Sequence, residues 1–219
     1  MRVASVSLNR DQSTLVLAAL RARLRAGEWI EGEPLTVSEL ATECGVSQTP
    51  VREVLARLAG EGLVEERRGR GYHARRIDSA ELADLYRAQK LLTRVAVASR
   101  ACQRAPEPLA FGCRPDDFLT HPVSTWEALF DALITRANSG FLRQDQKRLA
   151  NLLAPARRIE PSVLGETSAD FTELVTALAK SDWPTLDSAL ERLLQRRRAA
   201  VEDLVVRMRL DVREYKVSI

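Results

Sequence analysis

Residues 36–58 carry the sequence TVSELATECGVSQTPVREVLARL, which decides the fold of the first part of the chain. The spacing of Thr36 and Glu39 is that of a capping box and predicts a helix that ends near Gly45. A second helix is predicted from Ser47, because apolar residues recur there at i, i+3, i+4 and i+7: Val51, Val54, Leu55 and Leu58. Two helices joined by so short a turn form a helix-turn-helix pattern.

The second helix of this pair has a polar surface at its N-terminal end. Its side chains there are small or polar, as in a helix that enters the major groove of DNA. These residues are Ser47, Gln48, Thr49 and Arg52. Any amphipathic pair of helices shares the pattern, so the pair alone also fits a purely structural role.

The segment after this helix is strongly basic. Residues 63–65 and 72–74 are predicted strands of a hairpin with a tight turn at residues 67–71. Between Arg67 and Arg76 there are five arginines and no acidic residue. Such a hairpin can neutralise phosphates or enter a minor groove, and its glycines let the backbone approach closely. Together with a helix predicted over 13–26, these features indicate a DNA-binding winged helix-turn-helix.

The sequence from Ser47 to Leu55, with Leu58, Glu61-Gly62-Leu63-Val64 and Arg68-Gly69-Arg70-Gly71, closely resembles the signature of GntR-family bacterial winged-helix transcription regulators. The resemblance covers about residues 13–76. It implies that two groups of residues contact DNA, one at the major groove and one at the tip of the wing. The first group is Ser47, Gln48, Thr49 and Arg52, and the second is Arg68, Gly69 and Arg70.

Two positions depart from the family pattern. An arginine commonly stands where this chain has Gln48, and another often stands where it has Ser38, so two usual guanine readers are missing. Because glutamine pairs in bidentate fashion with adenine, we hypothesise that Gln48 reads an A·T pair; the alternative is a phosphate contact. For Arg52 a phosphate contact that sets the register is the favoured interpretation.

Beyond Ile77 the strand signals fade and helices are predicted near 78–101, 125–137, 141–154, 168–180 and 184–209. The fold is therefore predicted to be mainly α, with a winged helix-turn-helix domain at 1–77 and an all-α antiparallel helical bundle at 78–219. The bundle resembles the FCD domain of the FadR-like branch of the family. Such domains often hold a divalent metal with one aspartate and three histidines.

A metal site of that kind is not expected in this chain. Its only histidines are His73 and His121, and the family's histidine positions align with Asp131, Phe171 and a residue near Leu193. Since imidazole supplies most of the affinity for zinc or nickel, we predict no bound transition metal and no other cofactor.

Other residues near the family's ligand pocket are candidates for binding an effector. Arginines can hold a carboxylate and a phenylalanine can form an apolar wall, although the same residues also fit a solvated surface and a plain core. The candidates are Arg94, Asp131, Arg136 and Phe171. The family's arginine and glutamate on the first bundle helix are replaced by Gln89 and Thr93, which suggests either a different ligand, such as a larger and more apolar one than a small organic acid, or none.

Composition excludes several classes of protein. The 219 residues carry 33 Lys and Arg against 30 Asp and Glu, a net charge of +3, so any nucleic-acid signal must be local. There is no apolar run of membrane-spanning length, and the three cysteines, odd in number, are expected to be reduced thiols of a cytoplasmic protein. The sequence contains neither a nucleophile elbow nor a phosphate-binding glycine loop, so no motif in it suggests an enzyme.

The function predicted from the sequence is that of a ligand-responsive repressor, acting as a homodimer on an inverted-repeat operator in double-stranded DNA. DNA half-sites one helical turn apart require two copies of the reading helix, which favours the homodimer. In the alternative, the bundle only dimerises or binds a protein partner, without a small-molecule effector.

Overall fold

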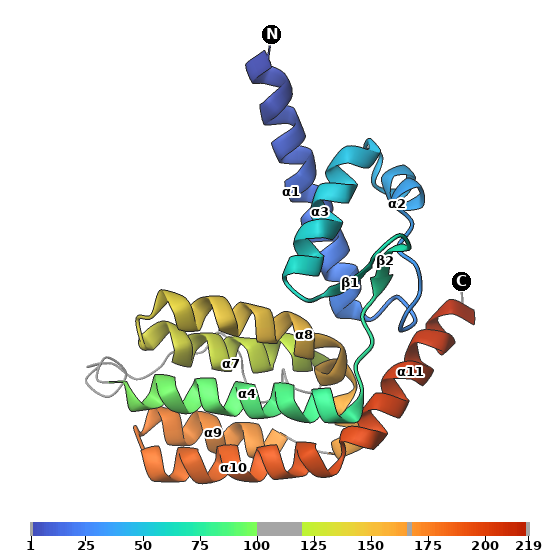
Figure 1. Ribbon diagram of the computed structural model, residues 1–219. Helices are drawn as coiled ribbons and strands as arrows, with labels where there is room; N and C mark the ends of the chain where they lie inside the picture. Colours follow the sequence, from blue (N-terminus) through green and yellow to red (C-terminus); the bar gives the residue numbers. More distant parts are fainter. Residues whose placement is uncertain (1, 100–119, 166–167, 218–219) are drawn as a thin grey trace. The chain divides into compact units, whose positions relative to one another are not determined.

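The computed structural model describes residues 2–99, 120–165 and 168–217. The chain divides into two compact units, one formed mainly by the residues up to Ile77 and joined by the residues from Arg209 on, and the other by Asp78–Met208. Both are built around helices, and two short antiparallel strands form the only sheet in the described ranges (Figure 1). The mainly helical fold predicted from the sequence is confirmed. No helix in these ranges is long and apolar enough to cross a membrane.

The first unit is a three-helix arrangement with a hairpin. Its elements are α1 (Arg2–Ala26), α2 (Val37–Cys44), α3 (Gln48–Gly60), β1 (Val64–Arg67) and β2 (Gly71–Ala74). The hairpin is in register from Val64↔Ala74 to Arg67↔Gly71. Helix α3 packs against α1, α2 and β1 (Figure 1). Its apolar stripe is buried there, and the residues on its opposite side are exposed.

The turn between α2 and α3 depends on Gly45. This residue has φ 65° and ψ 33°, in the left-handed region that glycine adopts without steric cost, and caps the end of α2. Its N–H lies 3.2 Å from the carbonyl oxygen of Thr42, and the next N–H, of Val46, bonds to Ala41 at 3.0 Å. The chain therefore reverses within two residues and begins α3 at once.

Two sequence predictions for this unit need correction. The first helix begins at Arg2 rather than at residue 13, and no glycine or proline lies between residues 2 and 26 to end it. Thr36 is the N-cap of α2 as expected, but its side chain makes no capping hydrogen bond, so the predicted capping box is not formed.

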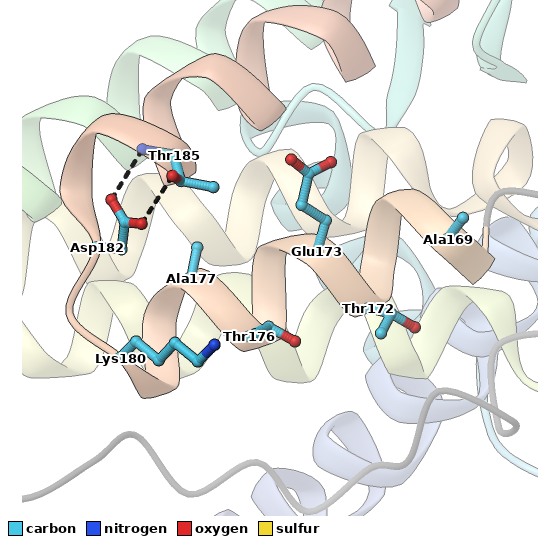
Figure 2. A pocket seen from close by; sticks show the side chains of 8 residues that line it. All are labelled: Ala169, Thr172, Glu173, Thr176, Ala177, Lys180, Asp182 and Thr185. Atoms are coloured by element: carbon cyan, nitrogen blue, oxygen red, sulfur yellow. Dashed lines mark hydrogen bonds between the residues drawn. The ribbon is translucent and has the colours of Figure 1, made fainter.

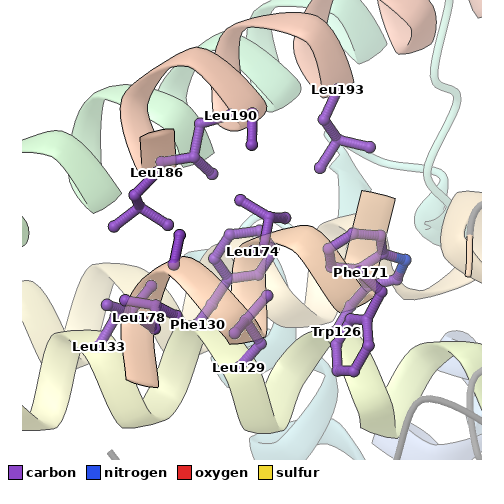
Figure 3. Close-up of a cluster of buried hydrophobic side chains, with 12 residues drawn as sticks. Trp126, Leu129, Phe130, Leu133, Phe171, Leu174, Leu178, Leu186, Leu190 and Leu193 are labelled. Atoms are coloured by element: carbon purple, nitrogen blue, oxygen red, sulfur yellow. The ribbon is translucent and has the colours of Figure 1, made fainter. Parts of the chain in front are cut away.

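The second unit is a helical bundle. It contains α4 (Ser79–Ala98), α7 (Pro122–Arg136), α8 (Gly140–Leu164), α9 (Ser168–Ala179), α10 (Trp183–Ala199) and the first part of α11 (Val201–Val217). Asp78 caps α4, because its carboxylate accepts a hydrogen bond of 2.8 Å from the N–H of Glu81. Helices α7, α9 and α10 enclose an apolar core in which Trp126, Phe130 and Phe171 are fully buried (Figure 3).

The predicted helix ends in this unit differ from those observed in three places. Helix α7 starts at Pro122, in the first turn where proline is favoured, so Ser124 is not its cap. Helix α8 does not stop at residue 154 but continues through Pro155 and Pro161. The predicted helix 184–209 is two helices, because the N–H of Ala200 bonds to Arg197 in a tighter turn that ends α10.

Candidate nucleic-acid interface

The N-terminal end of α3 presents the polar residues expected from the sequence. Ser47, at the N-cap, and Gln48, Thr49 and Arg52 are all exposed. Pro50 and Val51, between them, are buried, which holds this turn of the helix against the body of the unit. The helix is thus anchored by one side while four polar side chains lie at the surface.

Two of these side chains are linked to each other. A guanidinium N–H of Arg52 donates a hydrogen bond of 3.2 Å to the amide oxygen of Gln48, one turn earlier on the helix. The bond leaves the amide N–H₂ of Gln48 available as a donor. Both groups are exposed, so the pair can rearrange when a stronger partner such as a base edge arrives.

At the tip of the wing, Arg68, Gly69 and Arg70 are exposed. Gly69 and Gly71 have φ values of 71° and 75°, which side chains rarely adopt, and a Cβ at either would meet nothing within 4 Å. The backbone angles of the tight turn, rather than a lack of space, therefore require glycine at both positions. The turn leaves Arg68 and Arg70 at the surface.

Two of the other three arginines in this run have structural partners. Arg67 pairs with Glu65 at 2.7 Å, and the guanidinium of Arg75 donates to the carbonyl oxygen of Gly62. The run of five arginines in the sequence therefore overstates the number of arginines available to DNA: Arg68 and Arg70 are exposed at the tip of the wing, and Arg76 is exposed after β2.

The sequence did not single out Tyr72, which lies half-buried on β2. Burial raises the pKa of the Tyr72 phenol, the charge of Glu66 acts in the same direction and that of Arg52 opposes it. Tyr72 is thus within electrostatic reach of α3. An aromatic residue among the wing arginines was the sequence signal for it.

The effector candidates of the second unit are spread over different environments. Arg94 on α4 pairs with Asp187 at 2.9 Å and is about half exposed, Asp131 is exposed on α7, and Arg136 is partly exposed at the end of α7. Phe171 is fully buried and meets Trp126 edge to face, with 5.5 Å between ring centroids. Neither of the two cavities described next is lined by any of the four.

The larger of these cavities is an open groove along α9 and the start of α10, with a volume of about 510 Å³ (Figure 2). Small and polar side chains line it, and Asp182 at one end accepts hydrogen bonds from the N–H and hydroxyl of Thr185. The smaller cavity, of about 10 Å³, lies deeper and is lined by Tyr86, Gln89, Lys90, Phe130, Leu190, Leu193, Leu194 and Arg197.

Sequence reasoning missed a buried polar cluster beside the smaller cavity. Its members come from α4, α8 and α10 and are all less than 4% exposed: Tyr86, Gln89, Thr93, Gln146, Arg157, Glu160 and Arg197. A signal was present, because Arg157 follows Leu149 and Leu153 at four-residue spacing, and Arg197 follows Leu193 likewise.

Within the described ranges, no three His, Cys, Asp or Glu residues are grouped so that they could hold a metal ion.

The comparisons with known proteins concern both units. Residues 12–73 match the family model "Bacterial regulatory proteins, gntR family". The Nta operon transcriptional regulator of Aminobacter aminovorans is 41% identical over 76 residues, which cover 35% of this chain and 36% of that protein. The chain thus matches little more than a third of the length of this curated relative.

Solved structures extend the likeness in fold to most of the chain. E. coli McbR/YncC has a TM-score of 0.66 and 22% identity over 88% of this chain and 97% of that one. A structure from Rhodococcus sp. RHA1, named as a GntR transcriptional regulator, has a TM-score of 0.69 and 18% identity over 87% and 97%. Residues 12–73 therefore form a helix-turn-helix domain of the gntR family of bacterial regulatory proteins.

Proposed function

We propose that this protein is a sequence-specific, DNA-binding transcription regulator that acts as a homodimer. One observation carries the proposal: the polar N-terminal end of α3 and the tip of the wing are exposed in a domain of the gntR family. The naming of its relatives as transcriptional regulators supports the same assignment, and no relative reported above is named as an enzyme. The protein is accordingly expected to act in the cytoplasm.

The proposed DNA contacts divide into two kinds. Gln48 and Thr49 reach base edges in the major groove, with Gln48 reading an A·T pair, while Arg52 bonds to phosphate and sets the register. At the wing, Arg68 and Arg70 neutralise phosphates on either side of a minor groove that the backbone of Gly69 can approach. Ser47, at the start of α3, adds an N-terminal phosphate contact.

Dimerisation is supported by symmetry and by an apolar surface. Two reading helices are needed for an inverted repeat of half-sites. In the bundle, Leu91 and Val95 lie one turn apart on α4 and are 54% and 57% exposed, so the two side chains form a small apolar surface on this helix. A second copy of the chain packed on this surface of α4 buries both.

For the second unit there are two candidate roles. In the first, it binds an effector, a small organic acid or a larger apolar molecule held near Arg94, Asp131, Arg136 and Phe171, and thereby releases a repressor from its operator. In the second, it serves only as a dimerisation or protein-interaction module. The second role is favoured by the core itself, because Trp126, Phe130 and Phe171 fill the space between α7, α9 and α10.

The test of DNA binding starts with selection of sites from a random duplex pool by the full chain. Binding of the selected site is then measured over a salt series for the wild type, Gln48→Ala, Arg52→Ala and Arg57→Ala. The last is a matched control, since Arg57 is exposed on the same helix but pairs with Glu61 at the far end. We expect Gln48→Ala to lose preference at one base pair by about tenfold or more, corresponding to roughly 1–3 kcal/mol.

Arg52→Ala should weaken all sites equally and reduce the salt slope by about 1, and Arg57→Ala should change neither. The absence of any selected sequence would refute the proposed reader. For the two roles of the bundle, thermal unfolding with a panel of metabolites separates them, because an effector that binds the folded protein raises the unfolding temperature.

A further inference from the structure

Tyr72 lies on the face of the hairpin that covers α3. Side chains alternate along a strand, so Tyr72 shares its face with Ala74 on β2 and with Val64 and Glu66 on β1. Val64 and Ala74 are both buried, and β1 packs against α3. Tyr72 therefore continues the packed face of the hairpin by one step towards the tip of the wing.

The hydroxyl of Tyr72 has no hydrogen-bond partner in the part of the chain that the structure describes. Its main-chain carbonyl accepts the N–H of Leu35 at 2.8 Å, which fixes the backbone but leaves the phenol unused. The ring is partly buried, whereas its oxygen is not among the buried polar atoms that lack a partner. The hydroxyl is thus held by its ring and open to an acceptor from outside.

Two charged groups act on this hydroxyl. Glu66 is directly opposite Tyr72 in the register and exposed, while Arg52 is exposed on α3. Burial of the phenol and the charge of Glu66 raise the pKa of Tyr72, and the charge of Arg52 lowers it. The net shift is upward, so the phenol keeps its proton near neutral pH and offers a donor without a charge.

Arg52 and Tyr72 belong to one stretch of surface that DNA can cover. Exposed charges act over about 10 Å at moderate ionic strength, so the effect of Arg52 on the phenol places the two groups near each other. One strand of DNA carries a phosphate about every 3.4 Å along the helix axis. A phosphate held by Arg52 therefore has neighbours close to Tyr72, and phosphate oxygens accept from neutral hydroxyls as well as from arginine.

From these observations we propose that Tyr72 is a further DNA-contacting residue, whose hydroxyl donates a hydrogen bond to a phosphate beside the one held by Arg52. This contact joins the strand that α3 reads to the base of the wing. The inference rests on the proposed DNA binding and adds a neutral contact to those of the exposed arginines.

The test compares Tyr72→Phe, which removes only the hydroxyl oxygen, with Tyr86→Phe as a matched control. The hydroxyl of Tyr86 is buried in the second unit and donates to Glu160, which also accepts from Arg197 at 2.7 Å. Affinity of the full chain is measured over a salt series for the selected duplex and for a random duplex. A further set of duplexes carries one uncharged methylphosphonate, placed at each backbone position in turn.

We expect Tyr72→Phe to bind both duplexes about tenfold more weakly, since one hydrogen bond to a charged group is lost. The salt slope should not change, in contrast to Arg52→Ala, because no charge is removed. Tyr86→Phe should instead lower the unfolding temperature and leave the affinity unchanged. At one backbone position, the methylphosphonate should weaken the wild type more than Tyr72→Phe, because both changes remove the same contact.

Three results overturn the proposal. If no methylphosphonate has a smaller effect on Tyr72→Phe than on the wild type, the hydroxyl contacts no phosphate. If the loss of affinity disappears in the background of Glu66→Gln, the hydroxyl serves Glu66 rather than DNA. If Tyr72→Phe lowers the unfolding temperature as Tyr86→Phe does, its role is structural.

Failure of the proposed function gives a different result. A wild type that binds the random duplex but selects no sequence is not a sequence-specific regulator. The affinities of Tyr72→Phe and the wild type for the random duplex still test the phosphate contact in that case. A wild type that binds no duplex refutes both.

Discussion

The two units of the molecule place their arginines in opposite ways. In the helix-turn-helix unit, Arg52, Arg68 and Arg70 are exposed, and their guanidiniums are stabilised by water. In the bundle, Arg157 and Arg197 are inside the core and depend on Glu160, Gln89 and aromatic rings, with Arg197 4.5 Å from the ring centroid of Trp126.

This difference shows what the same side chain can do in two settings. An exposed arginine contributes little to folding and remains available to an external anion such as a phosphate. A buried arginine is tied to the stability of the unit, because removal of its partner leaves a charge that water cannot reach. Substitution of the exposed arginines in the first unit should therefore impair DNA binding, whereas substitution in the buried cluster of the second unit should lower the stability of the fold.

The largest effect is expected inside the bundle. Glu160→Gln removes the charge that compensates Arg197 and should lower the free energy of unfolding by about 3–5 kcal/mol. Denaturant unfolding followed by circular dichroism measures this loss. Asp84→Asn is the control, since its pair with Arg87 is exposed and should contribute about 0–1 kcal/mol. Equal effects of the two substitutions would erase the contrast between buried and exposed charge.

The next effect is expected at the wing and concerns DNA only. Arg68→Ala combined with Arg70→Ala should reduce the slope of log affinity against log salt by about 2, because two phosphate contacts are lost. The unfolding temperature should not change, as both side chains are exposed. A drop in stability comparable with that of Glu160→Gln would show that the wing arginines are structural.

An alkaline titration sharpens the comparison through Tyr86. Burial, reinforced by the charge of Glu160, raises the pKa of its phenol well above 10. The folded state thus keeps a proton that the unfolded chain releases, so the contribution of Tyr86 to stability is complete below pH 10 and is lost as the pH rises beyond it. In ultraviolet titrations, Tyr86→Phe should leave the tyrosine ionisation of the folded protein near pH 10 unchanged. A smaller ionisation signal in the variant would mean that Tyr86 is accessible.

The smallest effect compares two helix caps. Asp78→Ala removes a side chain that accepts the N–H of Glu81 and should cost about 1 kcal/mol. Thr36→Ala, at the start of α2, removes no capping hydrogen bond and should cost clearly less. Denaturant midpoints of the two variants give the difference, and a larger loss for Thr36→Ala would show that the capping box forms in solution.

The first unit was more predictable from the sequence than the second. Its turns depend on glycines in left-handed conformations, at Gly45 and Gly69, and such local requirements are visible in the sequence. The polar end of α3 followed from helical periodicity alone. What the sequence overstated was the free charge of the wing, because the ion pair of Arg67 with Glu65 joins residues facing the same side of one strand.

In the second unit, tertiary packing overrode local signals. Proline is the strongest helix breaker, yet α8 continues past Pro155, since Ala156, Arg157, Ile159 and Glu160 are all buried beyond it. Alanine is the best helix former, yet the chain leaves the helix at Ala200. Arginines are usually exposed, so Arg157 was not expected inside the core.

The two prolines of α8 bear on how the bundle folds. A proline at position i cannot donate to the carbonyl at i−4, so Pro155 and Pro161 interrupt the ladder of hydrogen bonds on both sides of Arg157 and Glu160. The last three turns of α8 therefore have little helical tendency of their own and depend on packing against α4 and α7. We therefore expect the charged centre of the bundle to form together with the packing of its helices rather than on a preformed helix.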